Sequence, residues 1–350
     1  MNEQGLSRRS FLRTSALAGA TLAASAPRVH AAGSDTVRIA TVGAGDRGVF
    51  DVESCLKSAP GVELVAMADL FQDKVDKTLE RLKKNVPAQV KVAPKDVALG
   101  FDAYKKILAR DDVDLVMLLT PPGFRPEMAA AAIEAGKHLF MEKPGAVDPV
   151  GIRSLLDTSA KADAKKRSIV VGTQQRYAPQ YLELIQRLRD GQIGDLTLIE
   201  ALWIGDMELW HYADRKSEWS DMEWQVRCWP FFTWLSGDHY VEQLVHNLDV
   251  ANWVAGGTPV VCQGIGGRQV RVGPQFGNIF DHFAVRYEYA NGLPMFGMAT
   301  QIRGVSTRVC NVIHGTKGTA EVNRGMAKIE GEKPWRSEEH TSELQSRQSI

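Results

Sequence analysis

The chain has 350 residues, of which 44% are hydrophobic and 24% are charged, so it is long enough for two domains that each bury a core. Lys plus Arg and Asp plus Glu both number 42, and this balance argues against a nucleic acid or an anionic membrane as partner and favours a small molecule. The 4 cysteines are widely separated and form no C-x-x-C pair, which excludes the usual zinc and thioredoxin-like spacings.

The first 33 residues have the pattern of a targeting segment, so we exclude them from the fold. Residues 7–12 (SRRSFL) precede an apolar stretch over 14–26, and small residues near 29–31 provide a cleavage site. Paired arginines followed by Phe-Leu are typical of the twin-arginine export signal; the alternative is a signal for the general unfolded-export pathway. The apolar stretch is too short to span a membrane. We therefore expect a periplasmic or otherwise exported protein.

A dinucleotide-binding pattern begins after residue 36. A β-rich run over 37–42 is followed at once by G-x-G-x-x-G, whose glycines are Gly43, Gly45 and Gly48. The first glycine permits a tight turn, the second lets the backbone approach a pyrophosphate, and the third lets the next helix pack on the strand. We expect these glycines, with Asp46 and Arg47 between them, to bind the cofactor at the N-terminus of that helix.

A second β-rich run, over 62–68, ends in Asp69. This spacing suits an acidic side chain that accepts hydrogen bonds from the adenosine ribose hydroxyls. A carboxylate there also repels a 2'-phosphate, which favours NAD over NADP. The alternative is a strand-terminal Asp that only caps the following turn.

The alternation of strands and helices continues to about residue 175. Helical patterns alternate with buried-strand runs, the helices over 102–110, 126–135 and 149–164 and the strands over 113–119, 138–141 and 168–171. Thr120 and Pro121 end one strand, and Glu142 and Lys143 follow the next, at the edge where a parallel sheet meets its ligand. The sequence therefore predicts an α/β protein whose N-terminal domain, over 36–175, is a doubly wound Rossmann fold.

The sequence E-K-P at 142–144, preceded by A-G-K-H at 135–138, resembles the Gfo/Idh/MocA family of glucose-fructose oxidoreductase and inositol dehydrogenase. The resemblance covers roughly residues 36–330. It implies a C-terminal α+β domain over 176–335, with an open, mostly antiparallel sheet that commonly forms an oligomer interface, and a sugar or polyol substrate. It also implies that Lys143 lies beside the nicotinamide and the substrate hydroxyl.

The position of Lys143 carries chemistry of its own. A lysine at the C-terminal end of a parallel strand points into the ligand crevice, where partial desolvation lowers its pKa and suits it to proton exchange. The alternative, by position alone, is a solvated surface lysine.

Residues 237–254 have the pattern of one helix, on which His239, Glu242, His246 and Asp249 follow one another along one face. In the family, an acidic residue four positions before a histidine acts with the E-K-P lysine, and Glu242 here replaces the more usual Asp. The resemblance implies His246 as the base, Glu242 as its orienter and Lys143 as the group that polarises the developing alkoxide. A solvated face and a divalent metal site of His239, Glu242 and His246 are alternatives. We expect no metal, because two histidines two turns apart would have to converge on one ion.

The region from 203 to 234 is rich in tryptophan and poor in periodicity, which is typical of a long insertion over the site. Its aromatic rings either stack on sugar rings or belong to the core or a subunit interface. Downstream, strand-like runs cover 283–289, 295–300, 309–314 and 319–322. We expect candidate substrate residues on both sides of the pocket, namely Arg176, Tyr177, Asp249, Asp281 and His282.

Export constrains the reaction, since free nicotinamide nucleotide is not expected to be replenished outside the cytoplasm. We therefore expect an oxidoreductase with a tightly bound NAD that is reset within the site, either by a second, ketonic, substrate or by the same substrate. In the latter case transient oxidation acidifies a neighbouring C–H, a leaving group departs, and the net reaction is glycoside cleavage. A nucleotide-binding protein without turnover is the third alternative. The expected partners are a small sugar or polyol and further copies of the chain.

The last 15 residues, 336–350, form a separate case. Residues 336–346 (RSEEHTSELQS) match the in-frame translation of a common sequencing-library adapter, so we expect an artefact tail and a truncated C-terminal domain. The alternative is a polar disordered tail.

Overall fold

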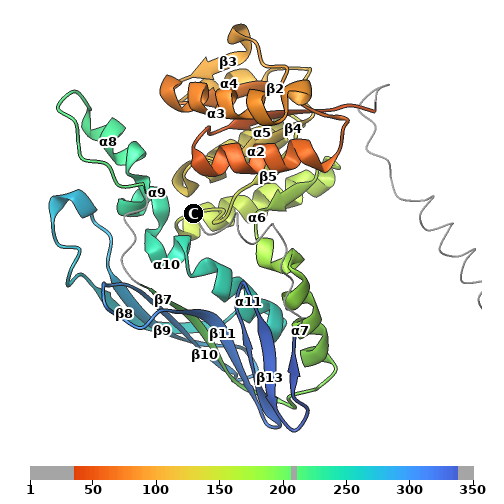
Figure 1. Cartoon of the computed structure of the whole chain (residues 1–350), viewed down its shortest axis with the longest axis vertical. Coiled ribbons are helices and arrows are strands. Elements are labelled where there is room, and N and C mark those ends of the chain that lie inside the picture. The colour runs from red at the N-terminus through yellow and green to blue at the C-terminus, as the bar shows by residue number, and fades with distance from the viewer. Residues whose placement is uncertain (1–34, 206–210, 338–350) are drawn as a thin grey trace, which may run out of the picture.

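The computed structural model describes residues 35–205 and 211–337. In this part of the chain two domains lie one above the other, with helices α10 (Asp238–Glu242) and α11 (Val245–Ala255) between their two sheets (Figure 1). The signal segment predicted over 1–33 and most of the predicted artefact tail lie outside the described residues. No helix within the described ranges is both long and apolar enough to cross a membrane.

The N-terminal domain is built on a six-stranded sheet of order β3-β2-β1-β4-β5-β6, in which every neighbouring pair is parallel. Its strands are β1 (Val37–Val42), β2 (Val62–Asp69), β3 (Val97–Leu99), β4 (Leu115–Leu118), β5 (His138–Met141) and β6 (Ile169–Val171). The order reverses direction at β1, where β2 and β4 lie on opposite sides of it. This arrangement confirms the predicted doubly wound Rossmann fold.

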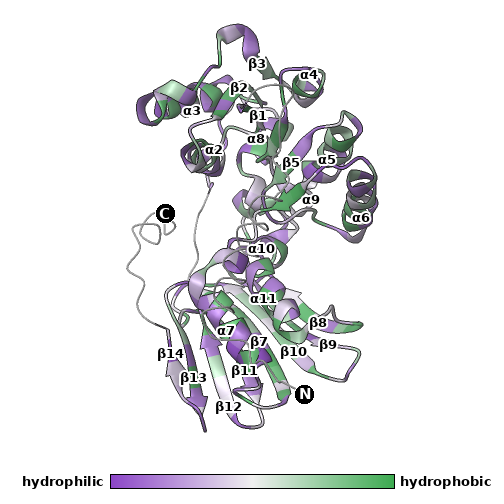
Figure 2. Cartoon of the chain, turned by 90° about the vertical axis from the view of Figure 1, so that its right-hand side faces the viewer, coloured by the Kyte–Doolittle hydropathy of each residue, from purple (hydrophilic) through white to green (hydrophobic). Residues whose placement is uncertain are grey.

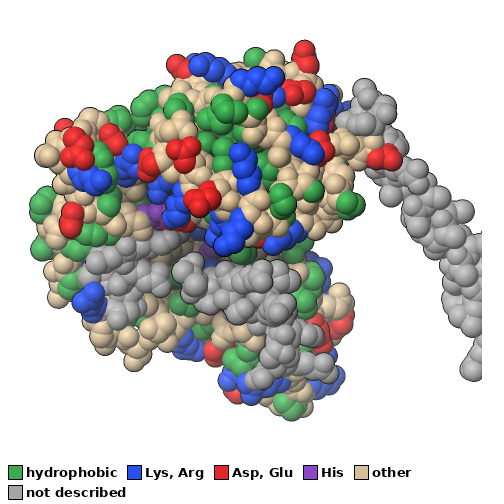
Figure 3. All heavy atoms as spheres, turned by 45° about the horizontal axis from the view of Figure 1, so that its top comes forward, with side chains coloured by type: hydrophobic (Ala, Val, Ile, Leu, Met, Phe, Trp, Pro, Cys, Tyr) green, Lys and Arg blue, Asp and Glu red, His purple; other side chains and the backbone are tan. Residues whose placement is uncertain are grey.

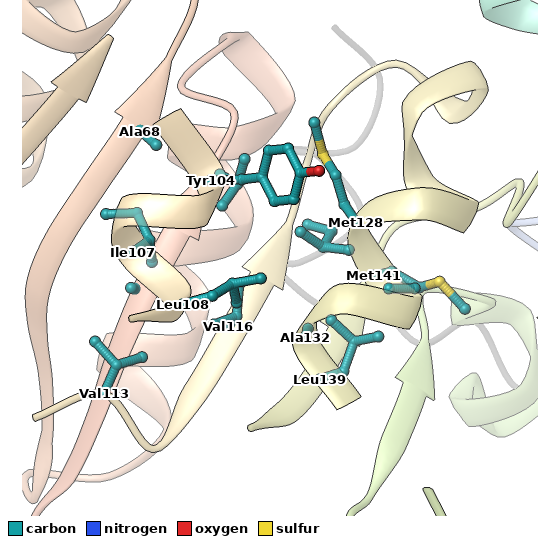
Figure 4. Packing of buried hydrophobic residues seen from close by; sticks show 14 of the residues in the cluster. Ala68, Tyr104, Ile107, Leu108, Val113, Val116, Met128, Ala132, Leu139 and Met141 are labelled. Carbon is teal, nitrogen blue, oxygen red and sulfur yellow. The ribbon is translucent and has the colours of Figure 1, made fainter. Parts of the chain in front are cut away.

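Helices cover both faces of this sheet, and each face has its own apolar core. Residues of α2 (Asp46–Ser58) and α3 (Gln72–Asn85) pack on one face. On the other face lie α4 (Ala103–Leu108), α5 (Arg125–Glu134) and α6 (Pro149–Ala164). Figure 4 shows Tyr104 and Ile107 of α4 on one side of the cluster and Met128 and Ala132 of α5 on the other. Because both faces of the sheet are buried, its strands are apolar runs rather than alternating ones.

The C-terminal domain contains an eight-stranded sheet of order β14-β13-β12-β11-β7-β10-β9-β8. Only the central pair β7–β10 is parallel, so the predicted open, mostly antiparallel sheet is confirmed. The strands are β7 (Leu196–Gly205), β8 (Val261–Gly267), β9 (His282–Glu288), β10 (Pro294–Gln301), β11 (Arg308–Gly315), β12 (Gly318–Val322), β13 (Ala327–Gly331) and β14 (Trp335–Arg336). Helices α7 (Pro179–Arg189) and α11 cover the face of this sheet that turns toward the N-terminal domain (Figure 2).

A helical arm rises from the C-terminal domain alongside the N-terminal one (Figure 1). We use this name for residues 211–236, which include α8 (Asp221–Arg227) and α9 (Thr233–Ser236). Its apolar cluster takes in Leu70, Phe71 and Phe124 of the N-terminal domain. The ring of Phe124 meets that of Trp234 edge-on at 5.8 Å, and a Cβ on Gly123 would come within 2.3 Å of the Trp234 carbonyl oxygen. The tryptophan-rich stretch is therefore a bridge between the domains.

One expectation about an element boundary needs correction, and the structure adds a detail at the C-terminal end. The single helix predicted over 237–254 is divided into α10 and α11, because Gln243 ends the first helix with its backbone at φ −102° and ψ −55°. The C-terminal sheet also extends beyond residue 335, since Arg336 pairs with Lys328 and Ser337 exchanges hydrogen bonds with Ala327. The predicted tail thus begins inside an edge strand.

Candidate active site

A cavity of about 1970 Å³ lies between the two domains. Its walls come from the glycine turn after β1, the C-terminal ends of β4, β5 and β6, the arm, α10, α11 and the ends of β7 and β10. Lys and Arg side chains border the hollow on the side of the N-terminal domain (Figure 3). All of the predicted cofactor residues line it: Gly43, Gly45, Asp46, Arg47, Gly48, Asp69, Thr120, Pro121, Glu142 and Lys143.

The three glycines of the turn have the separate roles that a dinucleotide site requires. Gly43 has φ +102°, and a Cβ on it would lie 2.7 Å from the carbonyl carbon of Leu119. A Cβ on Gly48 would lie 2.8 Å from the carbonyl oxygen of Gly43, so this glycine allows α2 to pack closely. Gly45 has no atom within 4 Å of its Cβ position, so its backbone is open to the cavity. These residues fit the pyrophosphate of a dinucleotide.

Asp69 lies at the end of β2 and also caps backbone groups, as the alternative interpretation expected. Its Oδ2 accepts from the backbone N–H of Ala44 at 2.7 Å, and its Oδ1 accepts from that of Phe71 at 2.9 Å. Burial raises the pKa of its carboxyl group, and the two backbone N–H groups act in the opposite direction. The side chain holds the glycine turn and lines the cavity, so the structural role does not exclude a contact with the ribose.

Lys143 and Glu242 form an ion pair across the domain boundary. The Nζ atom of Lys143 lies 2.5 Å from Oε1 of Glu242 and 2.5 Å from its backbone carbonyl oxygen. Both side chains are largely buried, with 13% and 7% of their surface exposed. The structure therefore pairs Glu242 with Lys143, whereas the sequence predicted it as the orienter of His246. The predicted solvated surface alternative for Lys143 does not hold.

Glu142 links the backbone of Lys143 to Arg47 and, through Arg47, to Asp51 of α2. Its Oε2 accepts from the backbone N–H of Lys143 at 3.0 Å, and its Oε1 accepts from Nη2 of Arg47 at 2.9 Å. Arg47 also donates to Asp51 of α2 at 2.9 Å. Burial and the neighbouring Glu142 carboxylate raise the pKa of Asp51 to about 7. These contacts join the N-terminal part of α2 to the loop that contains Lys143.

His246 lies on α11 and lines the same cavity, with 4% of its surface exposed. Its ring stacks on that of Trp203 of β7, with centroids 5.8 Å apart and planes at 21°. Burial, followed by the charge of Lys143, holds the pKa of the imidazole well below its usual value. The ring is therefore neutral near pH 7, the state in which it can accept a proton.

Several cavity residues were missed by the sequence analysis. Gln174 follows β6 and Gln301 ends β10, and each has a buried Oε1 without a hydrogen-bond partner among the described residues. The position of Gln174 at the end of a parallel strand was a usable signal. The position of Gln301 depends on the register of the C-terminal sheet, which the sequence did not supply. Two tryptophans of the rich region, Trp203 and Trp229, line the cavity.

The five predicted substrate residues lie outside the lining of this cavity. Arg176 and Asp249 form a two-pronged ion pair, both contacts at 2.8 Å, which ties the segment after β6 to α11. Tyr177 is 70% exposed. Asp281 is fully buried, where it accepts from the backbone N–H groups of 269–271 and bonds His282. These contacts give Arg176, Asp249 and Asp281 structural roles.

Residues 35–205 and 211–337 contain no group of three or more His, Cys, Asp or Glu side chains arranged to hold a metal ion. His239 and His246, which the metal alternative combined, lie on different helices, α10 and α11. His239 instead packs its ring against Phe283, with centroids 5.1 Å apart.

The curated relatives that the chain matches include glycoside hydrolases. It is 28% identical over 179 residues to a glycosyl hydrolase family 109 protein of Streptomyces coelicolor, covering 51% of this chain and 36% of that protein. It is 32% identical over 174 residues to an alpha-N-acetylgalactosaminidase of Shewanella oneidensis, covering 49% of this chain and 36% of that protein. The matched segment thus spans about a third of the length of these relatives.

Among solved structures, the chain resembles the aldose-aldose oxidoreductase of Caulobacter crescentus, with a TM-score of 0.66. The two are 17% identical, and the match covers 88% of this chain and 84% of that one. At this identity the likeness concerns the fold.

Two family descriptions match the two domains in turn. Residues 37–173 match the oxidoreductase family with an NAD-binding Rossmann fold, and residues 181–321 match the C-terminal domain of the same family. Both matches agree with the glycine turn, the E-K-P segment and the open sheet described above. The chain therefore belongs to the GFO/IDH/MocA oxidoreductase family.

Proposed function

We propose that the protein oxidises a hydroxyl group of a sugar or polyol with a nicotinamide cofactor that it retains between turnovers. The observation that carries this proposal is the Lys143–Glu242 ion pair, which lies on the wall of the cavity that also contains the glycine turn and His246. A fixed cation and a neutral histidine at a dinucleotide site can stabilise an alkoxide and accept its proton.

NAD, when bound, supplies the acceptor for the hydride that leaves the substrate carbon. The backbone around Gly45 would hold its pyrophosphate, and Asp69 would meet the adenosine ribose. Because a carboxylate at this position repels a 2'-phosphate, we favour NAD over NADP.

Two side chains of the protein have separate acid–base roles. Neutral His246 takes the proton of the substrate hydroxyl, and the ammonium group of Lys143 stabilises the negative charge that develops on that oxygen. Glu242 keeps this ammonium group in place, since it accepts through both its carboxylate and its backbone oxygen. Trp203 offers an aromatic face on the cavity wall, on which the C–H surface of a sugar ring can stack.

Retention of the cofactor agrees with the position of the arm. Arg227 of α8 lies 3.8 Å above the ring of Phe71 and donates to both carboxylate oxygens of Asp73 at 3.1 and 3.2 Å. His211, Trp229 and Arg227 line the cavity beside the predicted adenosine position. The arm thus forms part of the cavity wall and is fastened to the N-terminal domain. We propose that the protein is loaded with NAD before twin-arginine export and keeps it in the periplasm.

A second candidate is net glycoside cleavage on the same site. The observation that favours it is the similarity to a glycosyl hydrolase family 109 protein and an alpha-N-acetylgalactosaminidase. Oxidation of one ring hydroxyl would acidify the adjacent C–H, and loss of that proton would expel the aglycone. Water would then add across the double bond left by the elimination, and return of the hydride would restore the sugar, so the reaction needs no external oxidant.

The experiment that tests the proposal is to purify the full chain, denature it and analyse the released small molecules for nicotinamide nucleotide. Near-stoichiometric NAD or NADH supports retention, and the 2'-phosphate status tests the role of Asp69. A protein that carries none and fails to bind added NAD would overturn the oxidoreductase proposal.

Product analysis separates the candidates once the cofactor is established. Sugars and polyols incubated with the protein give an aldonate or keto-sugar if the hydride passes to a second substrate. Aryl glycosides incubated with the protein release the aglycone if the enzyme cleaves glycosides by oxidation and elimination. NAD-loaded protein that changes neither class would support the third alternative, a nucleotide-binding protein without turnover.

A further inference from the structure

A second, small cavity of about 20 Å³ lies beside Glu242, which also lines the large cavity. Five polar residues and two apolar ones form its walls: His239 and Glu242 of α10, Gln243, Gln301 of β10, Arg271, Pro230 and Phe231. A cavity of roughly 10–15 Å³ on this measure is enough for one water molecule, provided that polar groups surround it. This cavity therefore has the size and the lining of a single-water site.

His239 supplies the first unpartnered polar atoms. Only 4% of the residue is exposed, and neither Nδ1 nor Nε2 has a hydrogen-bond partner among the described residues. The ring of Phe283, whose centroid lies 5.1 Å from that of the imidazole, has no oxygen or nitrogen to act as a partner. A neutral imidazole carries one N–H donor and one acceptor nitrogen, and buried polar atoms without any partner are rare in proteins.

Gln301 supplies a buried acceptor at the same cavity. Its amide nitrogen donates to Oε1 of Gln243 at 2.6 Å, which fixes the orientation of the amide. Its own Oε1 is buried and has no partner in the described part of the chain. An unpaired donor from α10 and an unpaired acceptor from β10 therefore meet around one small space next to Glu242.

The backbone at the start of α10 has an unusual conformation that keeps His239 at this place. Gly237 and Asp238 have φ of +71° and +68°, and left-handed backbone is uncommon for Asp. The carboxylate of Asp238 accepts from the backbone N–H of Phe280 at 2.7 Å, and its own N–H donates to Ser236. Such backbone conformations cluster at functional sites. Here the turn places His239 and Glu242 one helical turn apart, toward the same cavity.

We propose that this cavity binds one ordered water molecule and that His239 is a positioning residue, which acts on Glu242 through that water. The water accepts from the His239 N–H and donates to Oε1 of Gln301 and to the carboxylate of Glu242. Three hydrogen bonds are the usual number for a buried water. The inference rests on the proposed function, in which Glu242 holds the ammonium group of Lys143.

The water adds a charge-assisted hydrogen bond to the carboxylate of Glu242 and so holds that carboxylate in place. The other charged groups around this carboxylate are Lys143 at the end of β5, Arg125 of α5 and Arg271 beside the small cavity. Burial lowers the pKa of His239 to about 3, so its imidazole stays neutral and can donate one N–H to the water. Loss of the water would therefore leave Glu242, and through it the ammonium group of Lys143, less firmly positioned.

The first test is a high-resolution crystal structure of the full chain, which needs no substrate. A density peak within hydrogen-bond distance of His239, Gln301 and Glu242 is expected in the natural protein and not in His239→Phe. A dry cavity in a map that resolves other buried waters would overturn the proposal. The electron density does not depend on turnover. A protein that oxidises no sugar would refute the proposed function, whereas the water site is tested by the density alone.

The second test separates positioning from packing. In His239→Phe we expect kcat to fall about tenfold with little change in KM, which corresponds to the loss of one charge-assisted hydrogen bond to Glu242. His239→Gln keeps a donor and an acceptor and should restore kcat. Gln301→Met, which removes the acceptor at similar size, should lower kcat as His239→Phe does and serves if the latter fails to fold. A kcat equal to that of the natural protein in both His239→Phe and Gln301→Met, or one that His239→Gln does not restore, would contradict the positioning role.

Discussion

Lys143 and Glu242, 99 residues apart in the chain, meet so that one ammonium group bonds both the side chain and the backbone of its partner. The contact joins the loop after β5 to the end of α10, and hence one domain to the other. Because both groups are largely buried, removal of either one would leave the other as a buried charge without its partner.

Removal of the lysine should therefore abolish turnover while the cofactor remains bound. We expect Lys143→Met to lower kcat by at least about 100-fold, the usual contribution of a positioned acid–base group. Glu242→Gln should reduce kcat in the same direction, because it leaves the ammonium group without its counter-charge. Turnover and NAD content are measured on the same preparations. Lys165→Met, at a half-exposed ion pair with Glu134, is the control for loss of a lysine charge. Unchanged kcat in Lys143→Met would remove the lysine from the mechanism.

The glycine turn separates cofactor binding from stability. In Gly45→Val the added side chain enters open space, so NAD content should fall sharply with little change in Tm. In Gly48→Ala the new Cβ meets the carbonyl oxygen of Gly43 at 2.8 Å, so Tm itself should fall. Nucleotide released on denaturation and thermal unfolding are the two measurements. Full NAD content in Gly45→Val would place the pyrophosphate elsewhere.

The arm should control how fast the cofactor leaves. Arg227→Ala removes the ion pair with Asp73 and the stacking on Phe71, and we expect NAD to dissociate about five- to tenfold faster. Arg215→Ala removes the same charge from an ion pair within the arm, that with Asp221, and should leave the rate unchanged. The rate is followed by exchange of bound NAD for labelled NAD. Equal rates in both variants would show that this contact does not limit release.

Acid should destabilise the fold through its buried histidines. Burial lowers the pKa of His211 to about 4, that of His239 to about 3, and that of His246 well below its usual value. Below pH 6.5 these three histidines therefore bind protons in the unfolded chain that they do not bind in the folded one, so their contribution to the free energy of unfolding falls as pH falls. Asp51, whose pKa is raised to about 7, contributes in the opposite direction. Each histidine contributes up to about 1.4 kcal/mol per pH unit. His246→Asn should flatten the slope between pH 6 and pH 5 in urea titrations; an unaltered slope would mean that His246 is already protonated in the folded state.

Exposed apolar side chains on β8 and β10 make this part of the C-terminal sheet a candidate contact between copies of the chain. Ile265 of β8 is 78% exposed, Val261 is 47% exposed, and Phe296 of β10 is 39% exposed. Exposed apolar groups of this kind mark protein contacts. We expect light scattering to give an oligomer for the natural protein and a smaller species for Ile265→Glu. A monomer in both cases would contradict the predicted homo-oligomer.

The sequence predicted the N-terminal domain closely because its signals are local. The apolar run at 138–141 and the helix from Pro149 match β5 and α6 residue for residue, since a glycine-containing turn and an N-terminal proline mark their limits. Strand β7 was missed because residues on both of its faces are buried, which removes the alternation that a half-buried strand shows. The break between α10 and α11 at Gln243 could not be predicted, because no Gly or Pro occurs there.

The sequence predicted the site residues that follow a parallel strand. It did not predict the residues that reach the site through contacts between distant parts of the chain. Lys143 follows a parallel strand, so its place in the crevice could be inferred. The contact of Arg47 with Glu142 joins residues 95 positions apart, and the convergence of Gln301 on Glu242 depends on the sheet register. Arg176 and Asp249 were predicted as substrate residues because they are polar and lie near motifs. In the structure they form an ion pair with each other.

The bridge formed by the arm also has a consequence for the order of folding. Leu70, Phe71 and Phe124 of the N-terminal domain pack against an apolar cluster formed by residues of the arm and by Phe276 and Ile279. During synthesis the N-terminal domain therefore emerges with an unfinished apolar surface, which stays open until the chain has grown past residue 236. An isolated N-terminal domain should be aggregation-prone, and the nucleotide crevice acquires its outer wall late, when most of the protein has already been made.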